Sequence, residues 1–201
     1  MPMTKTLPLR DIAEISAGYP FRTGISDDPD GTVRVIQMRD VSPTASVSWA
    51  STVRVRPEPN MQNYFLKQDD IVFVMRGGNY YGSLLAALPG PALAALHFFR
   101  IRITRSDMIL PAFLAWQLGQ SQVQRHCSSM EAGTAQKSLR LADFFALPIT
   151  VLPLDRQNKL LHAVNAIHKN MEAMESGITN CRQILSAIAE CELGTHRQEN
   201  A

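Results

Sequence analysis

The longest regular pattern of apolar positions lies in the last quarter of the chain, over residues 155–194. Apolar residues recur there at alternating spacings of four and three, which is the seam of a coiled coil. The seam positions are Leu160, Val164, Ile167, Met171, Met174, Ile178, Cys181, Leu185 and Ile188. No proline interrupts the stretch, and Gly194 stands where a C-terminal cap belongs. The pattern predicts one helix of roughly 55–60 Å.

A single helix of this kind cannot bury its own apolar stripe, so it requires a second surface. Two interpretations are open: a partner helix covers the seam, or the helix lies on the globular part of its own chain. The earlier part of the sequence carries no helix of matching length, which favours a second copy. We therefore expect a homodimer through this helix.

The first three quarters of the chain predict short strands joined by turns, with three shorter helices among them. The expected strands are 33–36, 47–55, 71–75, 84–88, 94–103 and 147–152. The expected helices are 9–16, 111–127 and 141–145. This order predicts an α+β fold and not a doubly wound one. We expect a β-rich globular domain over 1–153, the long coiled-coil helix over 154–194 and a disordered tail over 195–201.

Composition narrows the class of protein. The chain has 201 residues, of which 45% are hydrophobic and 19% charged, a balance that suits a globular domain with an extension. Its three cysteines form no Cys-x-x-Cys pair, which predicts a reduced protein without a disulfide framework or zinc site. The N-terminal ten residues lack the apolar core of a signal peptide, and no apolar run is long enough to span a membrane. We expect a cytoplasmic protein.

Basic residues are more frequent in the globular part. Residues 1–153 carry 15 Lys and Arg against 12 Asp and Glu, and 12 of those 15 are arginines. The planar arginine fork suits phosphates and guanine edges. Ordinary solvated arginines would give the same count, so charge alone does not decide.

The sequence contains no familiar catalytic motif. It lacks GxGxxG, a Walker-type loop, a GxSxG elbow and HExxH spacing. Asn79-Tyr80-Tyr81 only weakly resembles the Asn-Pro-Pro-Tyr motif of amino-methyltransferases, because both prolines are missing and no cofactor loop accompanies it. We therefore expect a protein with no catalytic residue, no metal site and no cofactor.

One loop, over residues 76–82, carries residue types that meet nucleic acid. Its glycines permit close approach of the backbone, and its asparagine and arginine can bond adenine and guanine edges. Its tyrosines can pack on sugar or base. The candidates are Arg76, Gly77, Gly78, Asn79, Tyr80 and Tyr81. A second loop, over 133–137, adds Thr134, Gln136 and Lys137. The alternative is that both are ordinary surface turns.

Five segments, in their order along the chain, resemble the DNA-specificity subunit of Type I restriction-modification systems. They are LRDIAEISAG at 9–18, VIQMRDV at 35–41, LKQDDIVFVMRGGNYYG at 66–82, AGTAQKSLRLADFF at 132–145 and LPITVLPLDRQ at 147–157. The last two are the most specific, because they occur together and adjoin the coiled coil. Pro148 and the Val151-Leu152 pair depart from the family pattern.

The resemblance implies a non-catalytic DNA reader. The usual subunit of the family has two target-recognition domains and two long helices, whereas this chain resembles a half-subunit with one of each. The domain over 1–153 would bind one half of a bipartite site in double-stranded DNA. The helix would separate two such domains and dock methyltransferase subunits, and a restriction subunit is the further partner that the resemblance allows. S-adenosylmethionine and ATP would belong to those partners, and no membrane is involved. The alternatives are a coiled-coil scaffold without DNA binding and a free-standing DNA-binding regulator.

The resemblance also implies that loops on the β-rich face read the DNA. On that ground we add Tyr19, Arg22 and Arg39 to the candidates, although Arg39 could pair with Asp40 or Asp69 instead. Arg22 and Lys137 suit phosphates. Asn79, Gln136 and Arg76 suit base edges.

Overall fold

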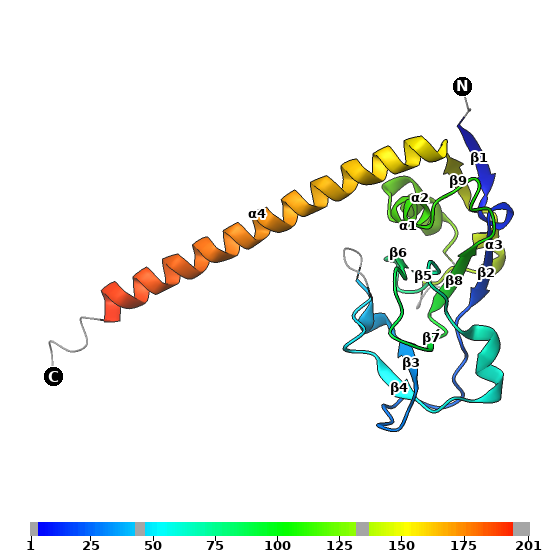
Figure 1. Ribbon diagram of the computed structural model, residues 1–201, viewed down its shortest axis with the longest axis horizontal. Helices are drawn as coiled ribbons and strands as arrows, with labels where there is room; N and C mark the ends of the chain where they lie inside the picture. The colour runs from blue at the N-terminus through cyan, green and yellow to red at the C-terminus, as the bar shows by residue number, and fades with distance from the viewer. Residues whose placement is uncertain (1–3, 43–46, 132–136, 195–201) are drawn as a thin grey trace. The chain divides into compact units, whose positions relative to one another are not determined.

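The computed structural model describes residues 4–42, 47–131 and 137–194. The chain divides into two compact units, Met1–Gln157 and Asn158–Ala201. The first unit is β-rich and the second is helical, so the expected α+β class is confirmed (Figure 1). The tail over 195–201 lies outside the described residues.

The strands of the first unit are short, and turns or one-turn helices join most of them. The strands are β1 (Lys5–Pro8), β2 (Ala13–Ala17), β3 (Val33–Ile36), β4 (Val53–Val55), β5 (Ile71–Val74), β6 (Gly82–Leu84), β7 (Ala92–Ala94), β8 (Phe98–Ile103) and β9 (Pro148–Val151). The helices are the 3₁₀ turns η1 (Leu9–Asp11), η2 (Met38–Asp40) and η3 (Pro59–Tyr64), then α1 (Pro111–Leu118), α2 (Ser121–Ser129), α3 (Leu141–Phe145) and α4 (Leu154–Gly194).

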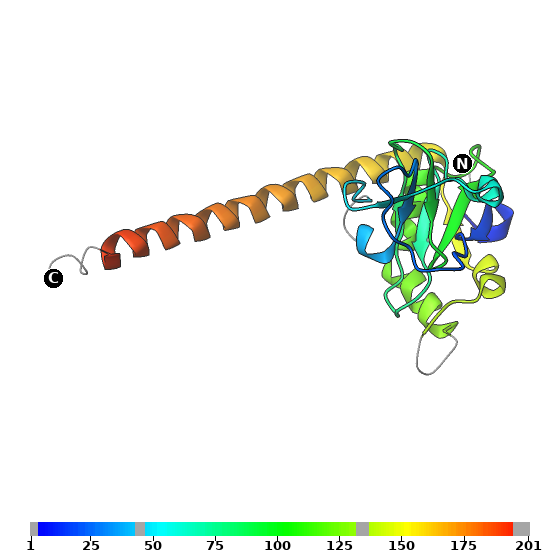
Figure 2. The same cartoon turned by 90° about the horizontal axis from the view of Figure 1, so that it is seen from below.

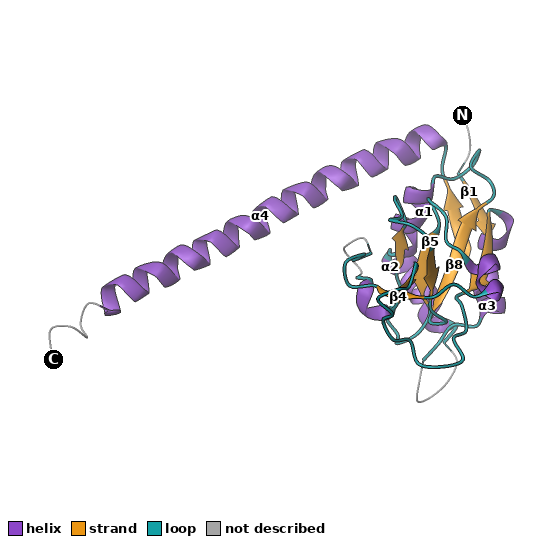
Figure 3. Ribbon diagram, turned by 60° about the horizontal axis from the view of Figure 1, so that its bottom comes forward, coloured by secondary structure: helices purple, strands orange, loops and turns teal. Residues whose placement is uncertain are grey.

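The described strands form three sheets (Figure 3). The largest has the order β2-β8-β5-β6 and is antiparallel throughout. A second has the order β4-β3-β7, in which β3 pairs with β7 in parallel. The third joins β1 to β9, so the two ends of the first unit meet in one ribbon.

The apolar core fills the space between the two larger sheets and continues on the other face of β5. Val72 and Val74 of β5 share one buried cluster with Ile36 of β3 and Ala94 of β7. On the opposite face, Phe73 stacks on a phenylalanine of α3 with ring centroids 4.6 Å apart. Because both faces are covered, every residue of β5 is buried, as the continuous apolar run predicts.

The predicted helix over 9–16 is wrong. A single 3₁₀ turn, η1, is followed by strand β2, which pairs antiparallel with β8 along its whole length. Within β2, Ala13 and Ile15 are buried and Glu14 is exposed, which is the two-residue period of a half-covered strand. The short segment fits both the helical period and the strand period. It forms a strand because it pairs with the edge of β8.

Four further boundaries differ from the prediction. Of the expected strand over 47–55, only Val53–Val55 forms a strand. The expected strand over 84–88 shares only Leu84 with β6, which begins two residues earlier and ends there. The stretch over 94–103 divides between β7 and β8, which belong to different sheets. The expected helix over 111–127 is two helices, interrupted at Gly119.

The end of the first unit is fixed by Gln157, in the first turn of α4. Its side chain is fully buried. Its amide oxygen accepts the backbone N–H of Leu110 at 2.9 Å, and its amide nitrogen donates to the carbonyl oxygens of Met108 at 2.7 Å and Leu152 at 2.6 Å. This glutamine therefore ties three chain segments together at the point where the long helix begins.

The second unit is the continuation of α4, a helix of 41 residues and about 60 Å (Figure 2). The predicted long helix is confirmed. Six of its seam side chains are 51–69% exposed in the single chain: Ile167, Met171, Met174, Ile178, Leu185 and Ile188. No helix of the described residues is long and apolar enough to cross a membrane.

Candidate functional site

The structure brings the two predicted loops together. Arg76 and Ser138 form an antiparallel bridge, the backbone N–H of Gly77 donates to the carbonyl oxygen of Lys137 at 3.1 Å, and Leu139 donates to Met75 at 3.0 Å. The loop after β5 therefore lies beside the segment that enters α3. Thr134 and Gln136 lie outside the described residues.

Two glycines give the first loop its shape. Gly77 and Gly78 have φ angles of +92° and +73°, in the region that residues with a Cβ rarely adopt. Around Gly77 there is open space, whereas a Cβ at Gly78 would lie 3.6 Å from the side chain of Lys137. These glycines turn the chain so that Asn79 stands exposed at the surface.

Lys137 carries its charge at the surface, beside a carboxylate. Its Nζ lies 2.9 Å from Oε2 of Glu131, and its side chain is 62% exposed. The ammonium group holds the pKa of Glu131 below its usual range. Only the lysine end of this pair is exposed, because the side chain of Glu131 is 12% exposed. Glu131 therefore holds the ammonium group of Lys137 at the surface of the unit.

Both tyrosines of the first loop point inward, which corrects the expectation that they pack on sugar or base. Tyr80 is 1% exposed and its ring stacks on Phe73, with centroids 6.4 Å apart. Burial, with a further contribution from Glu131, raises the pKa of Tyr80 to about 12. Tyr81 donates its hydroxyl to the carbonyl oxygen of Val41 at 3.0 Å. Both side chains anchor the loop to the core.

Arg76 is half-buried rather than extended toward solvent. Burial, and then the positive charge of Arg76, lower the pKa of His97 below its ordinary value. His97 in turn accepts the backbone N–H of Met75 through its carbonyl oxygen at 3.1 Å. The first loop is therefore in contact with the turn between β7 and β8.

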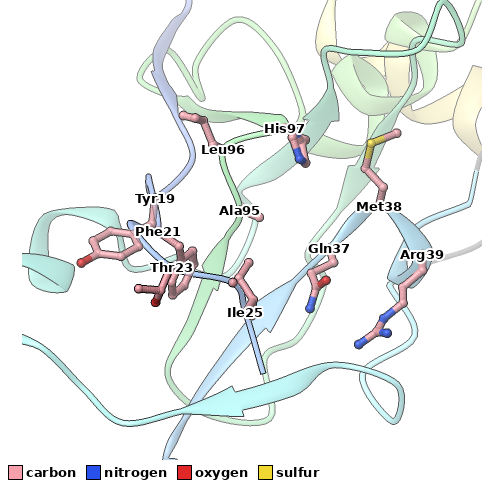
Figure 4. A pocket seen from close by; sticks show the side chains of 11 residues that line it. Tyr19, Phe21, Thr23, Ile25, Gln37, Met38, Arg39, Ala95, Leu96 and His97 are labelled. Carbon is pink, nitrogen blue, oxygen red and sulfur yellow. The ribbon is translucent and has the colours of Figure 1, made fainter. Parts of the chain in front are cut away.

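That turn borders a cleft of about 530 Å³ (Figure 4). The cleft lies between the segment that follows β2, the end of β3 and the end of β7. Its lining residues are Tyr19, Phe21, Thr23, Gly24, Ile25, Gln37, Met38, Arg39, Ala95, Leu96 and His97. Two of the predicted DNA-binding residues, Tyr19 and Arg39, therefore lie in one depression.

Tyr19 nevertheless presents little surface to a ligand. It is 5% exposed, and its ring packs edge-on against Phe21 and Tyr64. Its hydroxyl donates to Oε2 of Glu58 at 2.9 Å, and burial raises its pKa. We conclude that Tyr19 shapes the cleft wall, which corrects the expectation of a direct contact.

Gly18 explains why the chain can pass so close to β7. A Cβ at this position would overlap the carbonyl oxygen of Ala95. The backbone N–H groups of Gly18 and Tyr19 donate to the carbonyl oxygens of Phe98 and Ala94 at 2.9 and 2.8 Å. The glycine that ends the first resembling segment is therefore required by packing.

Arg22 and Arg39 remain exposed cations. Arg22 lines a neighbouring cleft of about 500 Å³. Arg39 is 61% exposed in its side chain, and its Nε lies 3.9 Å from Asp40, a loose contact. Asp40 is already occupied, because it accepts the backbone N–H of Gln37 at 2.8 Å and the hydroxyl of Ser51 at 2.9 Å. Arg39 is thus available to a ligand.

Four further residues lie in the same cleft as Arg39, although no sequence pattern selected them. They are Gln37, Met38, Leu96 and His97. They become neighbours because β3 and β7 pair in parallel, so both carboxyl ends reach one edge. A signal existed in the motif VIQMRDV at 35–41, where an arginine follows directly on an apolar strand. The turn at Leu96, between β7 and β8, was not expected because the sequence predicted one continuous strand over 94–103.

No family model matches the sequence, and no curated protein matches it closely enough to count. Solved structures do match. The S subunit of a Type I restriction-modification system from M. genitalium has a TM-score of 0.58 at 13% identity over 94% of this chain. The HsdS subunit from Thermoanaerobacter tengcongensis has a TM-score of 0.61 at 13% identity over 86%. A chain from a study of complex assembly and conformational transition of the type I R-M system has a TM-score of 0.69 at 14% identity over 96%.

The chain has the fold of a Type I restriction-modification S subunit. It spans 45%, 39% and 49% of the lengths of the three solved chains. The exposed cations Arg22, Arg39 and Lys137 and the exposed Asn79 all lie in the first unit, Met1–Gln157.

Proposed function

We propose that this chain is the DNA sequence-recognition subunit of a Type I restriction-modification system. The observation that carries the proposal is the fold shared with S subunits over 86–96% of this chain. Five sequence segments in the family's order support it independently. On this proposal the first unit, Met1–Gln157, is the recognition unit and reads one half of a bipartite site. The chain works in the cytoplasm without catalytic activity of its own.

The exposed polar groups suit two kinds of DNA contact. Arg22, Arg39 and Lys137 carry the positive charge that phosphates require. Asn79 stands at the tip of the glycine-shaped loop, where its amide can bond an adenine edge. Arg76 is half-buried, so we place it behind this loop as a support as well as a candidate for a guanine edge. Thr134 and Gln136 complete the proposed set.

The exposed seam of α4 supports the part of the proposal that concerns protein partners. Apolar side chains that are more than half exposed along a helix require a partner helix. We propose that two copies pair through this seam, and that the paired helices dock methyltransferase subunits. An antiparallel pair would place one recognition unit at each end.

A second candidate function is a coiled-coil scaffold without DNA binding, because the same seam would serve it. One experiment separates the two. The chain is co-purified with a methyltransferase subunit of a Type I system and mixed with a library of random duplexes. After several rounds of retention and amplification, the bound duplexes are sequenced. A DNA-recognition subunit enriches one motif, whereas a scaffold without DNA binding enriches none.

A further inference from the structure

Two large apolar side chains stand exposed in the described part of the recognition unit, and both line the cleft at the ends of β3 and β7. Met38 is 39% exposed and Leu96 is 40% exposed. The other exposed large apolar side chains of the described residues all belong to α4. Single exposed apolar residues are common, but two in one cleft mark a contact surface.

The parallel pairing of β3 and β7 explains why these two side chains line the same cleft. Ile36 is in register with Ala94, and the backbone N–H of Ala95 donates to the carbonyl oxygen of Ile36 at 3.0 Å. Met38 and Leu96 each lie two residues beyond this pair. Figure 4 shows both at the border of the cleft, with His97 between them in that view.

The charges of the cleft select the kind of partner. Arg39 is exposed beside Met38, and none of the described residues that line the cleft is a carboxylate. Arg22 adds a second exposed cation in the adjoining cleft. An apolar seat bordered by cations suits a polyanion that presents a small apolar group. In the major groove of DNA, that group is the 5-methyl of a pyrimidine.

We propose that Met38 and Leu96 form an apolar seat for a pyrimidine 5-methyl group, with Arg39 on a neighbouring phosphate. The inference rests on the proposed DNA-recognition function and adds the chemical group that this cleft reads. Thymine carries this methyl, and 5-methylcytosine carries the same one. Phosphate contacts would set the position of the chain, and the methyl contact would discriminate between bases.

The test uses the chain with its methyltransferase subunit and the duplex enriched from the random library. Each thymine is replaced in turn by deoxyuridine, which removes the methyl and keeps the O4 acceptor. We expect affinity to fall about fourfold at one position of each half-site, the effect of one buried methyl. In a third duplex series, 5-methylcytosine replaces thymine at that position and is compared with cytosine, to separate the two sources of the methyl. An affinity gain of about fourfold on methylation of cytosine shows that the seat accepts the methyl from either base.

Three variants decide the assignment. In the double variant Met38→Ser with Leu96→Ser, the penalty for deoxyuridine should disappear. Both positions are exposed, so unfolding monitored by tryptophan fluorescence should be unchanged. Met38→Leu keeps an apolar surface and should keep the fourfold ratio. Arg22→Ala should lower affinity for both duplexes and leave their ratio unchanged.

The outcomes separate this inference from the proposed function. Selective binding in which no deoxyuridine matters, or in which the double serine variant keeps the full penalty, overturns the methyl seat and leaves the function standing. Loss of the methyltransferase subunit from the double serine variant, with base preference unchanged, assigns the cleft to a protein partner and also overturns it. If the random library yields no selected motif, the proposed DNA-recognition function is overturned, and the methyl seat falls with it.

Discussion

Gln157 shows how one buried side chain can require a particular residue type. Its amide offers an acceptor to Leu110 and donors to Met108 and Leu152, and all three partners are backbone groups. A carboxylate could accept the N–H of Leu110 but could not donate to the carbonyl oxygens of Met108 and Leu152. A leucine could form none of the three hydrogen bonds. The glutamine that closes the resembling segment at 147–157 is therefore explained by hydrogen bonding at the start of α4.

Gln157→Glu should destabilise the recognition unit by about 2–5 kcal/mol, because it leaves two carbonyl oxygens facing a buried carboxylate. Asn158→Asp makes the same chemical change at the exposed neighbour and should stay within about 0.5 kcal/mol. Urea unfolding followed by the fluorescence of Trp49 and Trp116 reports this unit alone. Equal midpoints for the two variants would contradict the role given to Gln157.

Lys137 and Asn79 should differ in how their loss affects binding. Lys137→Ala should weaken binding to cognate and scrambled duplexes alike and lower the salt slope by about one. Asn79→Ala should cost about 1–3 kcal/mol on the cognate duplex and relax the preference at one base pair. Binding measured at two salt concentrations separates the effects. If Asn79→Ala leaves both affinity and preference unchanged, the loop does not read bases.

Cys127 should be chemically inert in the folded protein. Burial raises the pKa of this thiol to about 12, so it stays protonated and shielded at pH 8. A maleimide should label Cys127 only after urea is added, whereas the exposed Cys191 should react at once. Mass spectrometry of the labelled peptides gives the measurement. Rapid native labelling of Cys127 would show that α2 opens on the labelling timescale.

At the scale of elements, patterns with a clear period were predicted well. The long helix and the short helix α3 were found from their sequences, and so was the buried strand β5. The segment over 9–16 was assigned to a helix because eight residues satisfy both periods. Its strand depends on pairing with β8, some ninety residues later, and no local pattern carries that information.

The exposed seam of α4 predicts dimerisation that two charges should abolish. Ile167→Asp with Ile178→Asp places carboxylates in the seam and should give monomers at micromolar concentration. Asn165→Asp with Asn180→Asp adds the same charge outside the seam and should leave dimers. Light scattering distinguishes the states. An unmutated chain that is monomeric at this concentration would contradict pairing through α4.

At the scale of the whole molecule, the sequence located the loops that carry the candidate residues but not how their side chains lie. It identified the residues around Gly77 and Lys137, which the fold brings side by side. It could not show that Tyr80 turns into the core, because an aromatic residue after a buried strand serves packing and recognition equally well. The cleft of Met38 and Leu96 was missed because it arises from parallel pairing between distant strands.

If two copies pair through α4 as proposed, the twofold symmetry of the dimer constrains the DNA site that it would read. Two identical recognition units related by a twofold axis present the same contacts in opposite directions along a duplex. The two halves of the site should therefore be an inverted repeat with fixed spacing.

The most direct measurement maps methylated bases in genomic DNA from cells that hold the methyltransferase subunit, with and without the gene for this chain. The account predicts methylation at one bipartite motif, with halves that form an inverted repeat, and its loss when the gene is removed. Methylation that is the same in both genomes would contradict the claim that this chain is the DNA-recognition subunit.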